Sequence, residues 1–215
     1  MTNSLKQRVI TSLALFLILF FTITSNFILV YFLIVFSIYA FIEFANIISR
    51  VHIKNKINIF LSNIGFLIYL SCFSTMLLFT FIHPELKILT LSITLICIFS
   101  DIGGLIFGKL FKGPRLTKIS PNKTFSGAIG SFFFSIILSI FLFKGIYGLF
   151  SYYFILLGVT TSLATQLGDL FFSYLKRKAK LKDTGNVLPG HGGILDRIDG
   201  ILLGVPSGIL TLILL

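Results

Sequence analysis

Five aspartates are the residues of this chain whose scarcity and spacing suggest chemistry. Only seven of the 215 residues are acidic, and five of these are Asp101, Asp169, Asp183, Asp196 and Asp199. Asp196 and Asp199 stand three residues apart, which places both carboxylates on one helical face. Mg²⁺ prefers oxygen ligands, so this face, opposed to Asp169, would form a cation-binding pocket. The alternative, which the sequence leaves open, is that the aspartates pair with nearby arginines and lysines and neutralise helix ends.

A hydroxyl accompanies Asp169 one helical turn further along the chain. Ser173 follows it at the spacing i, i+4, so both side chains share one helical face. We therefore count Ser173 among the candidate substrate-binding residues, together with Asp101, which also sits near the inner end of an apolar segment.

A glycine-rich loop with the sequence Pro-Gly-His-Gly-Gly lies between these aspartates, at residues 189–193. Its glycines allow positive φ and a close backbone approach, so successive N–H groups can point at phosphate oxygens. His191 is predicted to bind phosphate or to handle a proton, with a structural or exposed histidine as an equal alternative. The candidate ligand-binding glycines are Gly190, Gly192 and Gly193. The basic residues that would neutralise phosphate are Lys176, Arg177, Lys182 and Arg197.

A second polar loop, residues 108–124, ends in Ser-Pro-Asn-Lys-Thr before an apolar run. Ser120, Lys123 and Thr124 place small hydroxyls and an ammonium at an expected helix start, whose partial positive charge favours anions. We predict an anion-binding role for these three residues. An ordinary N-cap by Thr124 or Ser126 is the alternative.

Apolar helices are the elements that must position these residues. The chain is 56% hydrophobic and only 12% charged, which is too little charge to cover a soluble domain. A spanning helix needs about 20 apolar residues. Seven segments qualify: 9–25, 27–47, 58–82, 86–107, 125–143, 146–172 and 199–215. We predict an all-α, polytopic membrane bundle of about seven helices, with a turn at Ser25-Asn26 and no cleavable signal peptide. Cys72 and Cys97 lie inside apolar runs and predict neither a disulfide nor a metal site.

The distribution of basic residues orients this bundle. Of 18 lysines and arginines, 16 lie in the N-terminal segment or in the loops 48–57, 108–124 and 173–198. Only Lys87 and Lys144 fall on the opposite side, so the positive-inside rule places the N-terminus and both polar loops in the cytoplasm. Contact with the anionic inner leaflet then accounts for the net charge of +11, and no nucleic-acid partner is expected. We expect residues 1–94 to form a scaffold and residues 95–215 to form the catalytic region.

The polar segment from Ser173 to Asp199 resembles the signature of the CDP-diglyceride synthetases, also called phosphatidate cytidylyltransferases. Its sequence is SYLKRKAKLKDTGNVLPGHGGILDRID. Further similar positions are Asp101, Gly103, Gly108-Lys109, Ser120-Pro121, Lys123-Thr124, Gly127 and Gly168-Asp169. The resemblance covers about residues 95–205, and its departures at Ile102, Asn122 and Phe125 remove no charged group needed for catalysis.

The resemblance implies the reaction of CTP with phosphatidate to give CDP-diacylglycerol and pyrophosphate. It also implies a Mg²⁺-containing centre held by Asp169 and Asp196, with a second metal ion left open. On this mechanism we expect Asp199 or Asp183 to support the centre and the basic residues named above to hold phosphates. Ser120, Lys123 and Thr124 would hold one end of the nucleotide or the lipid phosphate.

The expected setting is the bacterial inner membrane, with the active site facing the cytoplasm, membrane lipid around the helices and a homodimer left open. Two rival functions stay open at this point. One is another CTP-dependent lipid cytidylyltransferase or a lipid kinase, and the other is an ion-coupled transporter that uses its intramembrane aspartates.

Overall fold

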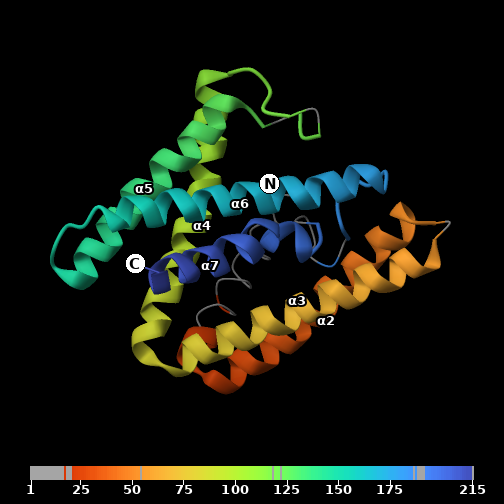
Figure 1. Cartoon of the computed structure of the whole chain (residues 1–215), viewed down its shortest axis with the longest axis horizontal. Helices are drawn as coiled ribbons and strands as arrows, with labels where there is room; N and C mark the ends of the chain where they lie inside the picture. Colours follow the sequence, from red (N-terminus) through yellow and green to blue (C-terminus); the bar gives the residue numbers. More distant parts are fainter. Residues whose placement is uncertain are drawn as a thin grey trace, which may run out of the picture. The chain divides into compact units, whose positions relative to one another are not determined.

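The structure is a computed structural model of the chain, and it describes residues 17, 21–53, 55–117, 119–121, 123–185, 187 and 192–214. Within these ranges the regular elements are six helices: α2 (Asn26–Val51), α3 (Lys56–Ile82), α4 (Pro84–Phe111), α5 (Phe125–Tyr147), α6 (Tyr153–Lys178) and α7 (Leu195–Leu214) (Figure 1). All six are long and apolar enough to cross a membrane. The chain is therefore an integral membrane protein of the all-α class, which confirms the predicted fold class.

Six of the seven predicted segments correspond to one helix each, and the segment 9–25 lies largely outside the described residues. The predicted break in the helix before α2 is confirmed, because Ser25 is extended, with φ −131° and ψ 119°. Several predicted bounds differ from those of the helices, and the largest difference is at the start of α6. The segment expected at 146–172 begins at Tyr153, because Gly148 adopts a φ of 74° and ends α5 at Tyr147.

The chain divides into two compact units. Unit 1 comprises Met1–Pro84 and Leu175–Ile198, and unit 2 comprises Glu85–Tyr174 and Asp199–Leu215. The boundaries fall inside α6 and α7, so the end of α6, the polar loop after it and the start of α7 belong with α2 and α3 in unit 1.

In unit 1, α2 and α3 pack against each other as an antiparallel pair (Figure 1). Phe44 stacks on Phe66 with ring centroids 3.9 Å apart, and the hydroxyls of Ser37 and Ser74 are 3.0 Å apart. This packing fixes, within unit 1, the end of α2 that the sequence predicts to be cytoplasmic.

In unit 2, small residues let helices approach closely, as is common in membrane bundles. A Cβ added to Gly103 of α4 would lie 2.5 Å from the carbonyl oxygen of Gly130 in α5. Ser100 of α4 and Ser162 of α6 share a buried hydrogen bond of 2.8 Å. Such contacts fix the helices that carry the acidic residues of this unit.

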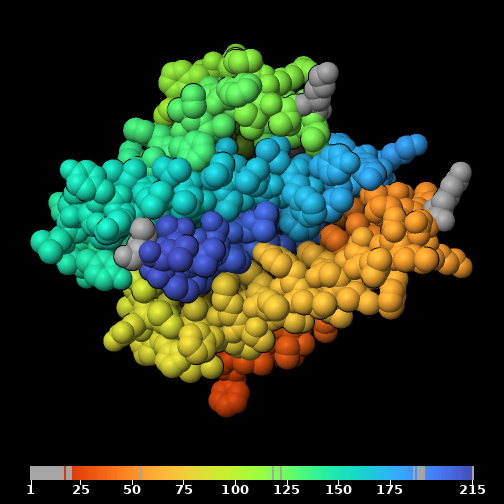
Figure 2. All heavy atoms as spheres, in the orientation of Figure 1, coloured from red at the N-terminus to blue at the C-terminus, as the bar shows by residue number. Residues whose placement is uncertain are grey.

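Large apolar side chains are widely exposed on the surface of both units. Along α3, Phe60, Leu61 and Phe79 are each at least 60% exposed, and Figure 2 shows part of this surface. In a membrane these side chains face lipid, which accounts for the apolar excess of the composition.

Candidate active site

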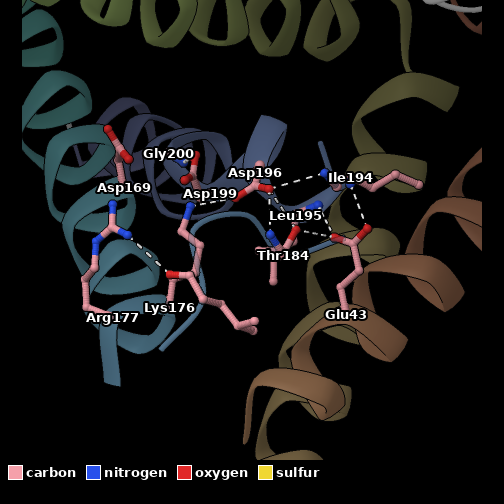
Figure 3. A network of polar contacts seen from close by, with 12 residues as sticks. Glu43, Asp169, Lys176, Arg177, Thr184, Ile194, Leu195, Asp196, Asp199 and Gly200 are labelled. Atoms are coloured by element: carbon pink, nitrogen blue, oxygen red, sulfur yellow. Dashed lines mark hydrogen bonds and ion pairs between the residues drawn. The ribbon is translucent and has the colours of Figure 1, made fainter. Parts of the chain in front are cut away.

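The first polar cluster lies in unit 1 and centres on Asp196, in the first turn of α7. Lys176 Nζ lies 2.6 Å from Asp196 Oδ1, in a pair whose side chains are only 12% and 8% exposed. Asp196 Oδ2 accepts from the backbone N–H of Thr184 at 2.8 Å, from its hydroxyl at 3.0 Å and from the N–H of Gly193 at 3.2 Å (Figure 3). Both carboxylate oxygens are therefore engaged by the chain's own donors.

The end of α6 places Lys176 for this contact. Leu181 N–H donates to the Lys176 carbonyl at 2.8 Å and Lys180 N–H donates to the Arg177 carbonyl at 3.0 Å. This is the paired hydrogen-bond pattern of a Schellman motif, with Lys180 at a φ of 57° where glycine is usual. The chain reverses there and returns to the start of α7.

Glu43 of α2 joins the same cluster, and we call Glu43, Lys176, Thr184 and Asp196 the Asp196 cluster. The Glu43 carboxylate, on a residue 3% exposed, accepts from the Thr184 hydroxyl at 2.7 Å. It also accepts from backbone N–H groups at the start of α7. The sequence patterns predicted no function for Glu43. The signal that could have found it is a single carboxylate within the apolar run 27–47.

The second polar cluster lies in unit 2, and we call Asp101, Lys123 and Asp169 the Asp169 cluster. Lys123 Nζ forms an ion pair with Asp169 Oδ2, and their side chains are 25% and 30% exposed. Asp101 of α4 lies close enough to interact electrostatically with both partners. Asp101 Oδ2 also lies near Gly200 of α7, where an added Cβ would be 3.8 Å away.

The loop before α5 positions Lys123. Leu116 N–H donates to the Lys123 carbonyl at 2.7 Å, and Arg115 pairs with Thr124 in an isolated antiparallel bridge. The Thr124 hydroxyl accepts from Gly127 N–H at 3.1 Å, so the alternative prediction of an N-cap is confirmed.

Lysines are the partners of two of the predicted site aspartates. Asp169 and Asp196 each pair with a lysine, as the alternative to a cation site predicted. The two pairs differ in how completely the chain surrounds the carboxylate.

The remaining predicted site residues are spread over both units. Arg177, Lys182, Asp183 and Arg197 are exposed, and Arg177 donates to the Leu181 carbonyl at 3.3 Å. Gly192 adopts a φ of 85°, which agrees with the predicted need for glycine.

Three further predicted residues, all partly exposed, lie in unit 2. The N–H of Ser120 donates to the Thr117 hydroxyl at 3.3 Å, and Asp199 Oδ1 accepts from Gly200 N–H at 2.9 Å. Ser173 lies in α6. The predictions for Gly190 and His191 fall outside the described residues.

Both proposed metal ligands have the donor chemistry that Mg²⁺ prefers, because each is a carboxylate. Each now carries a lysine ammonium as its counter-charge, which a bound cation would replace. Within the described part of the chain, no three His, Cys, Asp or Glu side chains gather closely enough to hold a metal by themselves. Phosphate oxygens or water would therefore have to complete the coordination.

The fold and the site together define a class of protein. It is a polytopic membrane protein with two carboxylate–lysine clusters and many basic side chains around them. A model of the cytidylyltransferase family matches residues 57–214. The chain belongs to this family, which confirms the family resemblance of the sequence.

Curated relatives are proteins named phosphatidate cytidylyltransferase. The one from Rickettsia bellii is 43% identical over 114 residues, which is 49% of each chain. The one from Mycobacterium bovis is 44% identical over 117 residues, or 54% of this chain and 37% of the relative. The one from Helicobacter pylori is 40% identical over 105 residues, which is 49% of this chain and 40% of the relative. The chain thus spans about half the length, or less, of these relatives.

Proposed function

We propose that this protein is a phosphatidate cytidylyltransferase that makes CDP-diacylglycerol and pyrophosphate from CTP and phosphatidate. The observation that carries the proposal is the family match over residues 57–214, which includes the whole polar segment, the Asp169 cluster and every member of the Asp196 cluster except Glu43. The names of the relatives from three bacterial genera point to the same reaction.

The proposed reaction is an in-line transfer of a cytidylyl group. A phosphate oxygen of phosphatidate attacks the α-phosphorus of CTP and forms a new P–O bond. The bond from that phosphorus to the oxygen shared with the β-phosphate breaks, and pyrophosphate leaves with the electron pair. Positioning and charge stabilisation supply most of the catalysis in such transfers.

The chain's own residues have distinct proposed roles in this transfer. Lys176, Arg177, Lys182 and Arg197 hold phosphate oxygens. Ser120, Lys123 and Thr124 hold one end of the nucleotide or the lipid phosphate. Lys123 is suited to its role, because it now neutralises the more exposed carboxylate of Asp169 and can neutralise a phosphate instead.

The proposed cofactor is Mg²⁺, with Asp169 and Asp196 as its protein ligands and a second metal ion left open. When bound, Mg²⁺ would offset the negative charge of the phosphates. Asp183 and Asp199 are proposed as supporting carboxylates.

Transfer of label from [α-³²P]CTP to phosphatidate by the purified protein tests the function. We expect organic-soluble label that depends on Mg²⁺ and on phosphatidate. Competition with a polyprenol or with another phospholipid tests the acceptor, and preference for one of these lipids would overturn the phosphatidate assignment. Metal-dependent ion flux in liposomes without CTP turnover would favour a transporter instead.

We further propose that the protein sits in the bacterial inner membrane with the site facing the cytoplasm. The support is the 16-to-2 split of basic residues. Val187 is 41% exposed in the polar loop, so a Val187→Cys variant in a Cys72→Ser background should react with an impermeant maleimide only after the membrane is opened. Labelling in intact cells would reverse the proposed orientation.

A homodimer is also proposed, because polytopic membrane enzymes with lipid-facing grooves often pair. Light scattering on the detergent-purified protein decides this, and a mass of one chain, 24.0 kDa after subtraction of detergent, would exclude it.

A further inference from the structure

Glu43 is a buried carboxylate that is bound by hydrogen-bond donors rather than by a cation. Its Oε1 accepts from Ile194 N–H at 2.9 Å, and its Oε2 accepts from Leu195 N–H at 2.8 Å and from the Thr184 hydroxyl at 2.7 Å. Among the described residues it forms no ion pair. The start of α7 supplies the compensating charge, because a helix N-terminus is partly positive and its first N–H groups have no partner within the helix.

Thr184 connects Glu43 to Asp196. Its hydroxyl lies 2.7 Å from Glu43 Oε2 and 3.0 Å from Asp196 Oδ2, while its backbone N–H donates to the same Asp196 oxygen at 2.8 Å (Figure 3). The two carboxylates therefore share one threonine, and Lys176 extends the chain of contacts on the far side of Asp196. A displacement of Glu43 would be passed directly to the carboxylate of Asp196.

Two glycines make room for this carboxylate. A Cβ added to Gly193 would lie 2.5 Å from Glu43 Oε2, and one added to Gly185 would lie 2.9 Å from Oε1. The Thr184 hydroxyl lies closer still to that position, so no side chain larger than hydrogen fits at Gly193 unless both Glu43 and Thr184 move. Both Gly185 and Gly193 of the polar loop thus leave space for the Glu43 carboxylate.

A buried carboxylate is an unfavourable residue for a role that is only structural. Burying it costs free energy unless every oxygen finds donors, whereas an apolar contact such as the Phe44–Phe66 stack carries no such cost. Here all the donors that reach Glu43 come from the segment that holds Asp196. These directional hydrogen bonds fix the position of the segment relative to Glu43, which an apolar contact would not do.

We propose that Glu43 is a positioning residue, which holds Thr184 and the start of α7 so that Asp196 and Lys176 keep their places in the active site. The catalytic part of this inference rests on the proposed function. It assigns a role in the site to a residue of the N-terminal region, which the sequence predicts to be a scaffold.

Hydrogen exchange of the Ile194 and Leu195 amides, followed by mass spectrometry, tests the anchoring without nucleotide or metal. In Glu43→Gln one amide N–H₂ group must face a donor, so we expect these amides to exchange at least about tenfold faster. Glu85→Gln is the matched control, because it makes the same change at an exposed site in the first turn of α4. Unchanged exchange in Glu43→Gln would overturn the proposal.

Turnover tests the positioning role. We expect Glu43→Gln and Thr184→Val to lower kcat by about 10- to 100-fold, as loss of residues that orient a functional group commonly does. The KM for CTP should stay within about threefold, since neither residue has a proposed role in binding the nucleotide. Thr184→Ser keeps the hydroxyl and should stay within about twofold of wild type, whereas Glu85→Gln should be unaffected.

The remaining outcomes are also decisive. Faster exchange in Glu43→Gln with unchanged kcat would reduce Glu43 to a structural residue and overturn the positioning role. If Glu43→Gln does not fold, the Thr184→Val and Thr184→Ser pair decides, and equal activity of the two would contradict the proposal. A wild-type protein that exchanges as expected but shows no CTP turnover would refute the proposed function and leave the anchoring intact.

Discussion

The two polar clusters differ in how much of their geometry the chain itself determines. In the Asp196 cluster both carboxylates are surrounded by donors, and the Lys176–Asp196 pair is at most 12% exposed. In the Asp169 cluster one ion pair, between Lys123 and Asp169, is 25–30% exposed. The first cluster is built into the fold of unit 1, whereas the second presents an accessible carboxylate with a single lysine on it.

This difference separates two tasks of a site that handles phosphates. A fully satisfied buried network holds one arrangement, because any member left without its partner is costly. A more exposed ion pair costs little to break, so its lysine can exchange a carboxylate for a phosphate. We infer that the Asp196 cluster fixes geometry and that the Asp169 cluster adapts to ligands.

The largest expected effect is on turnover. Asp169→Asn and Asp196→Asn should each lower the rate of CTP incorporation into lipid by at least about 100-fold, because each removes a charge proposed to bind the metal. Folded protein is checked by gel filtration and thermal unfolding. Near wild-type turnover in a folded variant would refute that residue's assignment as a metal ligand.

Neutralising the two lysines separately tests the comparison on stability. Lys176→Met should destabilise the protein by about 3 kcal/mol, because Asp196 stays buried without its cation. Lys123→Met should change the free energy of unfolding by less than about 1 kcal/mol, as is usual for exposed pairs. Denaturant titration in detergent micelles measures both values, and equal losses would show that the clusters do not differ.

A cap next to the Asp169 cluster should have a smaller effect. Thr124→Ala removes the acceptor for Gly127 N–H and should cost about 1 kcal/mol, while Thr124→Ser should retain most of that stability. The same titration applies. A Thr124→Ala variant as stable as wild type would mean that the hydroxyl serves a ligand rather than the helix.

The smallest expected effect concerns the turn that places Lys176. Lys180 adopts a φ of 57°, a conformation that costs an L residue about 1 kcal/mol relative to glycine. Lys180→Gly should therefore stabilise the protein by about 0.5–1 kcal/mol in the same measurement. A loss of stability would show that the Lys180 side chain makes a contact that matters more than the backbone strain.

The helices were predictable because their signal is local. Long apolar runs are enough to find α2 to α7, and the polar residues at Ser25 mark the start of α2. Thr124 before an apolar run predicts a cap for the same reason. The start of α6 was predicted too early because α5 continues to Tyr147, the turn begins at Gly148 and the apolar run continues across that turn.

The composition of the site was less predictable, because its contacts join distant parts of the chain. The Glu43–Leu195 hydrogen bond spans 152 residues, and the Glu43–Thr184 bond spans 141. Spacing in one sequence carries no information about contacts of this range. Charge type alone offered pairing of aspartates with lysines as an alternative. It did not predict that Asp169 would pair with Lys123 or Asp196 with Lys176.

The central claim, cytidylyl transfer to phosphatidate, is tested most directly by parallel reactions with [α-³²P]CTP and [γ-³²P]CTP. We predict that the α label enters the lipid, that the γ label appears only in pyrophosphate, and that the two products form in equal amounts. Entry of the γ label into lipid would identify a kinase. Absence of α label from lipid, in folded protein supplied with Mg²⁺ and phosphatidate, would contradict the proposed function.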